Sequence, residues 1–311
     1  MAFCLVTGGA GFVGSHVVDA LVARGDRVRV FDDFSTGNEE NLASVRERIE
    51  LIRGDLRDAS AVSAAVKGVD LVFHQAALAS VPRSVADPIS THEVCATGTL
   101  HVLIAARQAK VRRVIYAASS SAYGDAAQLP KRETDATAPL SPYAVAKLAA
   151  EHYCAAFSTV YGLETVRLRY FNVFGPRQPP DSPYAAVIPL FMEAMLEGRS
   201  PVIHGDGEQS RDFTYVSDVV QANLLAAQAK NVSGKVYNIA CGRRSSLLEL
   251  VAKINALLGT NIKPSHDEAR PGDVRHSQAD ISRARADLEF EPSVSMDEGL
   301  RRTLEYFHQK S

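Results

Sequence analysis

The sequence lacks both a long apolar run and a strong net charge. No apolar run approaches the roughly 20 residues that a membrane-spanning helix needs, so we expect no membrane partner. The formal net charge of -2 provides no basic field that would attract nucleic acid or an anionic membrane. We therefore expect no nucleic-acid partner. Any anionic ligand has to be held by local arginines and backbone amides.

The four cysteines form no motif. They stand at positions 4, 95, 154 and 241, without the CxxC spacing of zinc or redox sites. This pattern favours free thiols in a reducing cytoplasm and predicts no metal site. The opening MAFCLVTGG also lacks the basic region of a signal peptide and runs into a glycine turn, so it predicts a first strand.

Short apolar runs alternate with helical patterns through the first half of the chain, as in FCLVTG, HVVDALVARG, RVRVFDD and RRVIYAASS. This alternation predicts an α/β fold with a Rossmann-type doubly wound parallel sheet. Residues 173–189 are rich in proline and predict no regular element, whereas 211–229 return to a strand and a helix. We expect an NAD-binding domain over 1–173 plus about 214–243. A smaller C-terminal α/β substrate lobe would cover about 174–213 plus 244–311.

A glycine turn follows the first expected strand. TGGAGFVG places Gly8, Gly11 and Gly14 where backbone can approach a pyrophosphate at the positive end of a helix. Glycines alone also occur in ordinary strand-to-helix turns. Here Asp32 and Asp33 follow about 20 residues later, where an acid binds the adenosine ribose and repels a 2′-phosphate. The pattern therefore predicts NAD rather than NADP.

Tyr143 and Lys147 are four residues apart on an expected helix, so they share one face. Tyrosine has a pKa near ~10; lowering it by ~3 units needs about 4 kcal/mol, which a close ammonium and the nicotinamide ring can supply. Ser119 ends the expected fifth strand, at the sheet edge where ligands bind. A YxxxK pair is common on ordinary helix surfaces, but this setting favours an enzyme.

Several long motifs resemble one enzyme family. They are TGGAGFVGSHVVDAL, DDFSTG, HQAAL, SSSAYGD, SPYAVAK, RYFNVFGPRQ, GDGEQSRDFTYV and RPGDVRHSQAD, and they span nearly the whole chain. Together they resemble the extended short-chain dehydrogenase/reductase family, and within it the UDP-hexose 4-epimerases, close to those that take UDP-N-acetylglucosamine. The resemblance implies NAD as cofactor and a UDP-sugar substrate. The sugar would pass through a 4-keto intermediate, turn about its diphosphate link and be reduced on the opposite face.

The resemblance also implies roles for individual residues. Tyr143 would be the acid/base, Lys147 its partner and Ser119 the third catalytic group. Both Tyr143 and Lys147 would also bind NAD, together with Gly8, Gly11, Phe12, Val13, Gly14, Asp32, Asp33, Ser35, Thr36, Gly37, Asp55, Leu56, Gln75, Ala76, Ala77 and Tyr170. Asp55 has an alternative interpretation as a turn residue. The substrate would be bound by Tyr143 and by Ser80, Arg83, Ser119, Ser120, Ser121, Asn172, Ala186, Val187, Arg211, Arg270, Asp273 and Ser277.

Within this set, Asn172, Arg211 and Arg270 would hold the uridine diphosphate, because guanidinium groups can bind a diphosphate bidentately. Ser277 would form a wall of the sugar pocket. In the resembling enzymes a tyrosine at that position goes with UDP-glucose and UDP-galactose alone, and a small residue goes with the N-acetyl sugars. Ser277 therefore predicts acceptance of UDP-N-acetylglucosamine and UDP-N-acetylgalactosamine. The alternative is a loop residue, with another side chain closing the pocket.

One position departs from the family pattern. Cys95 stands where the family usually has an asparagine near the nicotinamide, so water positioning or the grip on the cofactor would change. The alternative interpretation is a packed core thiol. Separately, segments 99–108 and 143–157 are apolar on more than one face. We expect them to pair in a homodimer, as the family does; the alternative is packing inside one chain.

Three other functions are possible for this scaffold. A 4,6-dehydratase would carry an aspartate–glutamate pair where Ser120 and Ser121 stand. A UDP-glucuronate 4-epimerase or decarboxylase is the leading alternative. However, related uronate epimerases tend to have threonine at the position of Asn172, and decarboxylases have glutamate at that of Ser121. A catalytically inactive, NAD-sensing interaction protein would not need the intact serine, tyrosine and lysine.

Overall fold

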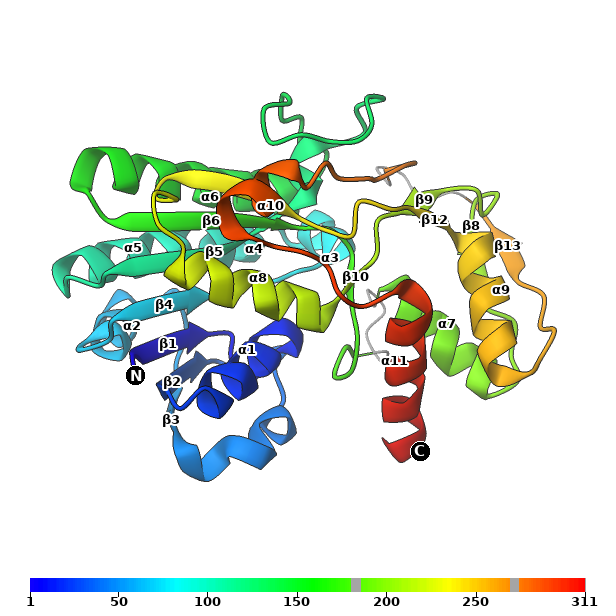
Figure 1. The fold of residues 1–311 in the computed structure, drawn as a ribbon, viewed down its shortest axis with the longest axis horizontal. Coiled ribbons are helices and arrows are strands. Elements are labelled where there is room, and N and C mark those ends of the chain that lie inside the picture. Colours follow the sequence, from blue (N-terminus) through cyan, green and yellow to red (C-terminus); the bar gives the residue numbers. More distant parts are fainter. Residues whose placement is uncertain (180–185, 269–273, 311) are drawn as a thin grey trace.

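The structure is a computed structural model that describes residues 1–179, 186–268 and 274–310. Its larger part is built on a seven-stranded sheet with the order β11–β6–β5–β4–β1–β2–β3 (Figure 1). All pairings within this sheet are parallel. The strands are β1 (Phe3–Thr7), β2 (Arg27–Asp32), β3 (Ile49–Arg53), β4 (Leu71–His74), β5 (Arg113–Ser119), β6 (Glu164–Tyr170) and β11 (Lys235–Ile239).

The strand order reverses between β1 and β4. The chain first winds outward from β1 to β3 and then crosses back to β4 before it continues to β5 and β6. Ligands of open parallel sheets bind outside the carboxyl ends of the strands at such a reversal. The predicted Rossmann-type fold is confirmed, and the reversal locates the site.

Helices cover both faces of the sheet, as Figure 1 shows. One face carries α1 (Phe12–Ala23), α8 (Val216–Gln228) and α10 (Ser282–Leu288). The other carries α2 (Ala59–Val66), α5 (Gly98–Gln108) and α6 (Pro142–Tyr161). Short helical segments join these elements: η1 (Glu39–Arg48), α3 (Val81–Ala86), α4 (Pro88–His92), the π-helical η2 (Glu93–Thr97) and η3 (Ser120–Tyr123).

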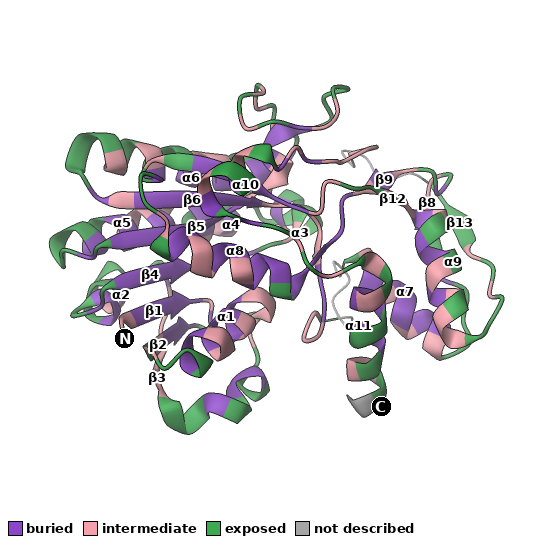
Figure 2. Ribbon diagram, viewed as in Figure 1, coloured by how far each residue is buried: buried purple, intermediate pink, exposed green. Residues whose placement is uncertain are grey.

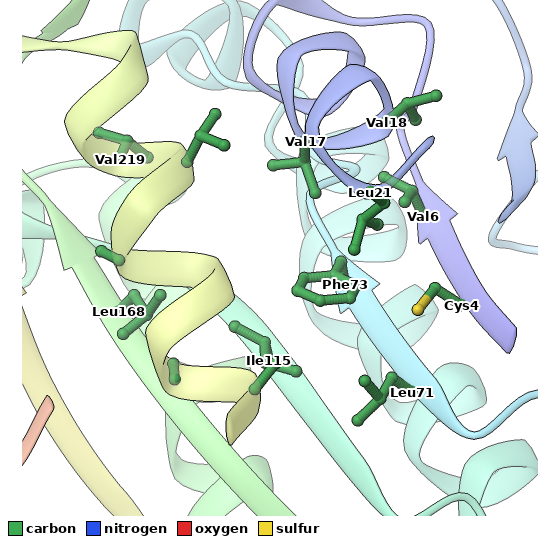
Figure 3. Close-up of a cluster of buried hydrophobic side chains, with 14 of the residues drawn as sticks. Cys4, Val6, Val17, Val18, Leu21, Leu71, Phe73, Ile115, Leu168 and Val219 are labelled. Carbon is green, nitrogen blue, oxygen red and sulfur yellow. The ribbon is translucent and has the colours of Figure 1, made fainter. Parts of the chain in front are cut away.

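The double cover explains the continuous apolar strands. Cys4 and Val6 face the core beneath α1 and α8, whereas Leu5 between them faces the opposite core. Figure 3 shows side chains of α1 and α8, among them Leu21 and Val219, close to apolar side chains of the sheet. Figure 2 shows the central strands buried along most of their length.

Over its described residues, the smaller part contains three two-stranded sheets, β10–β7, β12–β9 and β13–β8. Its core is formed mainly by apolar side chains of three helices, with Phe191, Leu250 and Leu300 among them. The helices are α7 (Val187–Leu196), α9 (Leu247–Leu258) and α11 (Met296–Lys310). The strands are β7 (Val173–Phe174), β8 (Val202–His204), β9 (Ser210–Arg211), β10 (Thr214–Tyr215), β12 (Ser245–Ser246) and β13 (Ser265–Asp267).

The expectation of no regular element over 173–189 was wrong at both ends. Strand β7 occupies Val173–Phe174, and α7 begins at Val187. Pro189 is the third residue of α7, within the first turn, where a missing amide proton breaks no intrahelical hydrogen bond. Proline content alone therefore did not mark the limits of this segment.

The domain division remains a prediction, but packing bears on its limits. Strand β11 joins the central sheet, and α8 packs against its strands. Ala284, Leu288 and Phe290 lie in the same core as β1 and β4. A division drawn from packing would therefore place 282–290 with the larger part, although the expected boundaries assign that segment to the smaller lobe.

All four cysteines are free, as expected; Cys4, Cys95 and Cys154 are buried. Within the residues described, no group of three or more His, Cys, Asp or Glu side chains could hold a metal ion. No described helix has both the length and the apolar character needed to cross a membrane.

Candidate active site

The glycine turn lies between β1 and α1. Gly8 has a φ of +67°, and a Cβ atom there would lie 2.6 Å from the Cα of Ala76, just after β4. A Cβ atom on Gly14 would lie 2.0 Å from the Gly8 carbonyl oxygen. Gly11 precedes α1 and offers no side-chain cap to its first amides. The close backbone packing and the uncapped helix end fit a dinucleotide pyrophosphate.

The acidic end of β2 folds back onto this turn. Asp32 is buried, and its carboxylate accepts hydrogen bonds from the amides of Ala10 at 2.8 Å and Phe34 at 2.9 Å. Burial raises the pKa of Asp32. Asp33 is exposed and accepts hydrogen bonds from the amide and hydroxyl of Ser35, at 2.9 and 2.7 Å. An acidic pair therefore lies beside the glycine turn, as the NAD prediction requires.

Other predicted cofactor residues surround the turn. Phe12 and Val13 begin α1, Thr36 and Gly37 lie in the loop after β2, and Ala77 follows β4. Sequence analysis missed Asn41, whose side-chain amide donates to the Ala10 carbonyl at 2.8 Å. Asn41 lies in η1, where half of the residues are charged, so no pattern indicated it.

Gln75 and Tyr170 were both predicted to bind the cofactor, and the fold brings them together. The Tyr170 hydroxyl donates to Gln75 Oε1 at 3.0 Å, and Gln75 Nε2 donates to Asn223 Oδ1 at 3.0 Å. Asn223 Nδ2 in turn donates to the Tyr170 hydroxyl at 2.7 Å. This closed ring joins β4, β6 and α8. Sequence analysis missed Asn223, although a buried polar residue within an apolar helix is a usable signal.

Asp55 lies after β3 and pairs locally. Its carboxylate accepts a hydrogen bond from the Arg57 amide at 2.8 Å and forms an ion pair with that side chain at 2.6 Å. The hydrogen bonds from Arg57 lower the pKa of Asp55. This geometry matches the alternative interpretation as a turn residue. Leu56 is buried and packs against Gly98 at the start of α5.

Ser119 and Tyr143 meet at the carboxyl edge of the sheet. Ser119 ends β5 and caps η3, with its Oγ accepting a hydrogen bond from the Ser121 amide at 3.2 Å. Its Oγ also lies 2.8 Å from the Ser121 Oγ. Tyr143 lies in the first turn of α6, after the cap residue Ser141, whose Oγ accepts from the Ala144 amide at 3.2 Å. A side-chain hydrogen bond links Ser119 to Tyr143.

Burial raises the pKa of Tyr143, and the Ser119 hydrogen bond opposes that rise. The expected lowering of this pKa is therefore not a property of the protein groups alone, because desolvation of the phenolate outweighs the hydrogen bond. Cys95 contributes a smaller part of the rise. It is buried against Leu78 and Ala146, as a packed core thiol would be.

Lys147 lies one helical turn beyond Tyr143 and is 4% exposed. Its Nζ lies 4.3 Å from the centre of the Tyr116 ring. Burial lowers the pKa of Lys147, and the Glu151 carboxylate is among the groups that raise it. Glu151, missed by sequence analysis, forms a buried bidentate ion pair with Arg169 at 2.8 and 2.7 Å. This pair joins α6 to β6 directly behind the lysine.

A cavity of about 490 Å³ lies in the smaller part. Four predicted substrate residues line it: Asn172, Ala186, Val187 and Arg211. Asn172 has a φ of +26°, a strained conformation of the kind that often marks a binding site. Sequence analysis missed several other polar lining residues, namely Gln178, Glu193, Arg199, His204 and Gln209.

The other predicted substrate residues lie elsewhere. Ser80 caps α3 by accepting a hydrogen bond from the Arg83 amide at 3.2 Å. The Ser277 amide donates to the carbonyl of Ser210, the residue before Arg211, at 3.0 Å, but Ser277 does not line this cavity. Ser120 and Ser121 begin η3. Arg270 and Asp273 lie outside the described residues.

A doubly wound sheet with a glycine turn at its reversal, and a Ser–Tyr–Lys set on the next strand and helix, defines a dinucleotide-dependent enzyme of the extended short-chain dehydrogenase/reductase class. Residues 4–240 match the family model described as the NAD dependent epimerase/dehydratase family. The chain belongs to this family, and NAD is its cofactor. The predicted family, enzyme class and cofactor are thus confirmed.

Similar proteins cover almost the whole chain. The UDP-glucose 4-epimerase of Mycolicibacterium smegmatis is 39% identical over 311 residues, covering 99% of both chains. A solved UDP-N-acetylglucosamine 4-epimerase from Methanobrevibacter ruminantium, in complex with UDP-N-acetylmuramic acid, is 43% identical with a TM-score of 0.95. It covers 100% of this chain and 99% of its own. A UDP-glucuronic acid 4-epimerase from Bacillus cereus, with UDP-glucuronic acid and NAD, is 32% identical with a TM-score of 0.93. That match covers 99% of this chain and 100% of its own.

Proposed function

We propose that the protein epimerises a UDP-hexose at carbon 4 through a 4-keto sugar, with Tyr143 as the acid/base. The observation that carries the proposal is the placement of Ser119 at the carboxyl end of β5 and of Tyr143 and Lys147 on α6, the helix that packs against that strand. The neighbouring strand, β4, leads to Ala76, which packs against the glycine turn. The reacting hydroxyl would therefore lie between the acid/base and the cofactor turn.

The proton is handled by three side chains. Burial raises the pKa of Tyr143, so the phenolate that would accept the sugar proton needs positive charge nearby. The Ser119 hydrogen bond favours the phenolate, and Lys147 would add positive charge from the same helix face. Glu151 helps the buried lysine to stay protonated. When bound, NAD would supply a reversible acceptor for the hydride that leaves carbon 4 of the sugar. The glycine turn and Asp32 would hold the cofactor.

The 490 Å³ cavity would receive the nucleotide end of the substrate. Arg211 lines it and can bind a diphosphate, while Phe174 and Phe213 provide apolar wall. A firm grip on the diphosphate would leave the sugar free to turn between the two hydride transfers. The epimerase complexed with UDP-N-acetylmuramic acid, at 43% identity, supports a UDP-linked substrate of this kind.

The sugar class is proposed from Ser277. A serine leaves room for an acetamido group at carbon 2, which a tyrosine would fill. We therefore propose that UDP-N-acetylglucosamine and UDP-N-acetylgalactosamine are interconverted at least as well as UDP-glucose and UDP-galactose. A relative named UDP-N-acetylglucosamine 4-epimerase supports this assignment.

The test is incubation of the purified protein with separate UDP-sugars and chromatographic resolution of the products, with Tyr143→Phe as the inactive control. The panel includes UDP-glucuronate, because a UDP-glucuronic acid 4-epimerase is 32% identical and three consecutive serines begin at the end of β5 in this chain. Epimerisation of UDP-glucuronate alone, or release of carbon dioxide from it, would replace the proposed substrate class. Unchanged sugars throughout would reject the proposed activity.

We also propose a homodimer formed through the face that carries α5 and α6. Large apolar side chains are exposed there, including Ile104 on α5 and Val145, Tyr153 and Val160 on α6. Light scattering behind size exclusion should give twice the chain mass of 33.6 kDa. A Val160→Asp variant should shift the mass toward the monomer. We further propose a cytoplasmic location, in which the four free thiols would stay reduced.

A further inference from the structure

Asp212 is a buried carboxylate at the centre of the substrate side. It lies between β9 and β10, directly after Arg211, and is 0% exposed. Its Oδ1 accepts a hydrogen bond from the Cys241 amide at 3.0 Å, and its Oδ2 accepts one from the Ala279 amide at 3.1 Å. Among the described residues, no basic side chain forms an ion pair with it. A buried charge held only by backbone amides is costly, so its presence calls for a physical reason.

The carboxylate joins segments that are far apart in sequence. Cys241 follows the last strand of the central sheet, whereas Ala279 lies two residues after Ser277, the expected wall of the sugar pocket. The Asp212 carbonyl also accepts a hydrogen bond from Asn172 Nδ2 at 3.4 Å. Asp212 therefore contacts Asn172 directly and is adjacent to Arg211, two residues that line the cavity.

The neighbouring backbone completes this arrangement. The amide of Ser277 donates to the Ser210 carbonyl at 3.0 Å, and Arg211 Nη1 donates to the carbonyls of Ser210 and Arg275 at 3.1 Å. If the Asp212 carboxylate loses one of its amide donors, the segment 275–279 can move relative to Arg211. The guanidinium group and the pocket wall would then lose their common alignment.

We propose that Asp212 is a positioning residue for the UDP-sugar, fixing Arg211, Asn172 and the Ser277 segment in one arrangement through backbone hydrogen bonds. The inference rests on the proposed function for the identity of the ligand. It extends that function by assigning the alignment of the nucleotide end to a residue that does not line the cavity. Burial raises the pKa of Asp212 to about 7, while its backbone hydrogen bonds lower it, so desolvation and the amides oppose each other at this site.

The chain offers a matched control six residues later. Asp218 is 1% exposed, and its carboxylate also accepts backbone hydrogen bonds, from the Ser293 amide at 3.0 Å and the Val294 amide at 3.3 Å. It joins α8 to the segment before α11 and does not line the cavity. Asn at either position keeps the shape of the side chain but replaces one acceptor oxygen with a donor. Both variants should therefore be less stable than the native protein, but only Asp212→Asn should lose substrate alignment.

The experiment compares Asp212→Asn and Asp218→Asn with the native protein. Affinity for UDP is measured by calorimetry, and NAD content is measured after denaturation. KM and kcat are measured with the UDP-sugar that is converted fastest. We expect Asp212→Asn to weaken UDP binding and raise KM at least tenfold with unchanged NAD content. Asp218→Asn should change neither the UDP affinity nor KM by more than about twofold, although the melting temperature of this variant also falls. Should Asp212→Asn not fold, Asp212→Ser removes the charge, keeps one acceptor and carries the same expectation.

Equal UDP affinities in the two Asn variants would overturn the proposal, and so would parallel loss of NAD in Asp212→Asn. Failure of both Asp212 variants to fold would also overturn it, because the role would then be structural. If the native protein binds UDP but converts no sugar, the proposed activity fails. The tenfold loss of UDP affinity would still support the positioning role. If the native protein binds no UDP, both proposals fall.

Discussion

Acidification should destabilise the protein through His74, which ends β4 and is 0% exposed. Burial, with a smaller contribution from Lys147, lowers the pKa of His74 from 6.5 to about 3. Below pH 6.5 the unfolded chain therefore gains a proton that the folded chain does not bind. The free energy of unfolding should then fall by about 1.4 kcal/mol per pH unit, or about 2.7 kcal/mol by about pH 4.5.

The hydrogen bonds around the ring explain why it stays neutral. The Thr99 hydroxyl donates to the Cys95 carbonyl at 2.6 Å, so it can only accept from His74 Nε2 at 2.9 Å. The proton must then be on Nε2, which leaves Nδ1 to accept from the Thr7 hydroxyl at 2.6 Å. A second proton on Nδ1 would face this hydroxyl and break the series of hydrogen bonds. These hydrogen bonds join β1, β4 and α5 immediately beneath the glycine turn.

The assay is urea unfolding of the native protein and of His74→Gln, from about pH 7.5 to about pH 4.5. The variant should be less stable at the higher pH, because a fully buried hydrogen-bonded ring is lost. The difference in unfolding free energy between the native protein and the variant should shrink by about 2.7 kcal/mol at the lower pH, because glutamine does not titrate. Nitrogen-15 NMR should find the ring proton on Nε2. A stability difference that does not change with pH, or a His74 resonance that titrates above about pH 5, would refute the reasoning.

Three further outcomes are expected. Tyr143→Phe should lower kcat about 100-fold or more and leave NAD content unchanged, since an acid/base contributes that much; a residual rate above about a tenth would contradict its role. The native protein should purify with NAD, whereas Gly14→Ala should not, because the new Cβ would lie 2.0 Å from the Gly8 carbonyl oxygen; release of equal NAD from both on denaturation would reject this reading of the turn. Ser277→Tyr should remove activity on the N-acetyl sugars and spare UDP-galactose; equal loss of both, or no change, would place the selecting wall elsewhere.

The sequence predicted the fold well because its signals are local. Continuous apolar strands occur where both faces of a sheet are covered, and the glycine turn and the Tyr143–Lys147 spacing are each set within a few residues. Resemblance to a family added the rest. The proline-rich segment misled because proline is excluded from helix interiors but tolerated in a first turn, where Pro189 lies.

The contacts that the sequence did not predict join distant segments. Asn223 completes a hydrogen-bonded ring with Gln75, 148 residues earlier in the chain, and no local pattern indicates such a partner. In the sequence, Glu151 resembles an ordinary exposed helix residue, and only the fold shows that it pairs with Arg169. The effect of burial on the pKa of Tyr143 was not predicted for a related reason, because spacing gives its position relative to Lys147 but not the extent to which the fold removes water.

The two ends of the site are built differently. On the proposed cofactor side, side chains form closed or directional hydrogen-bond networks between long strands and helices, as with Gln75, Tyr170 and Asn223. On the substrate side, two-residue strands are joined chiefly by backbone hydrogen bonds, and Asp212 ties them together. Interactions of many buried groups on long elements resist local opening better than short pairings do. The proposed reaction would keep one cofactor while its substrate exchanges and turns, so a firmer cofactor side and a more readily opened substrate side would suit it.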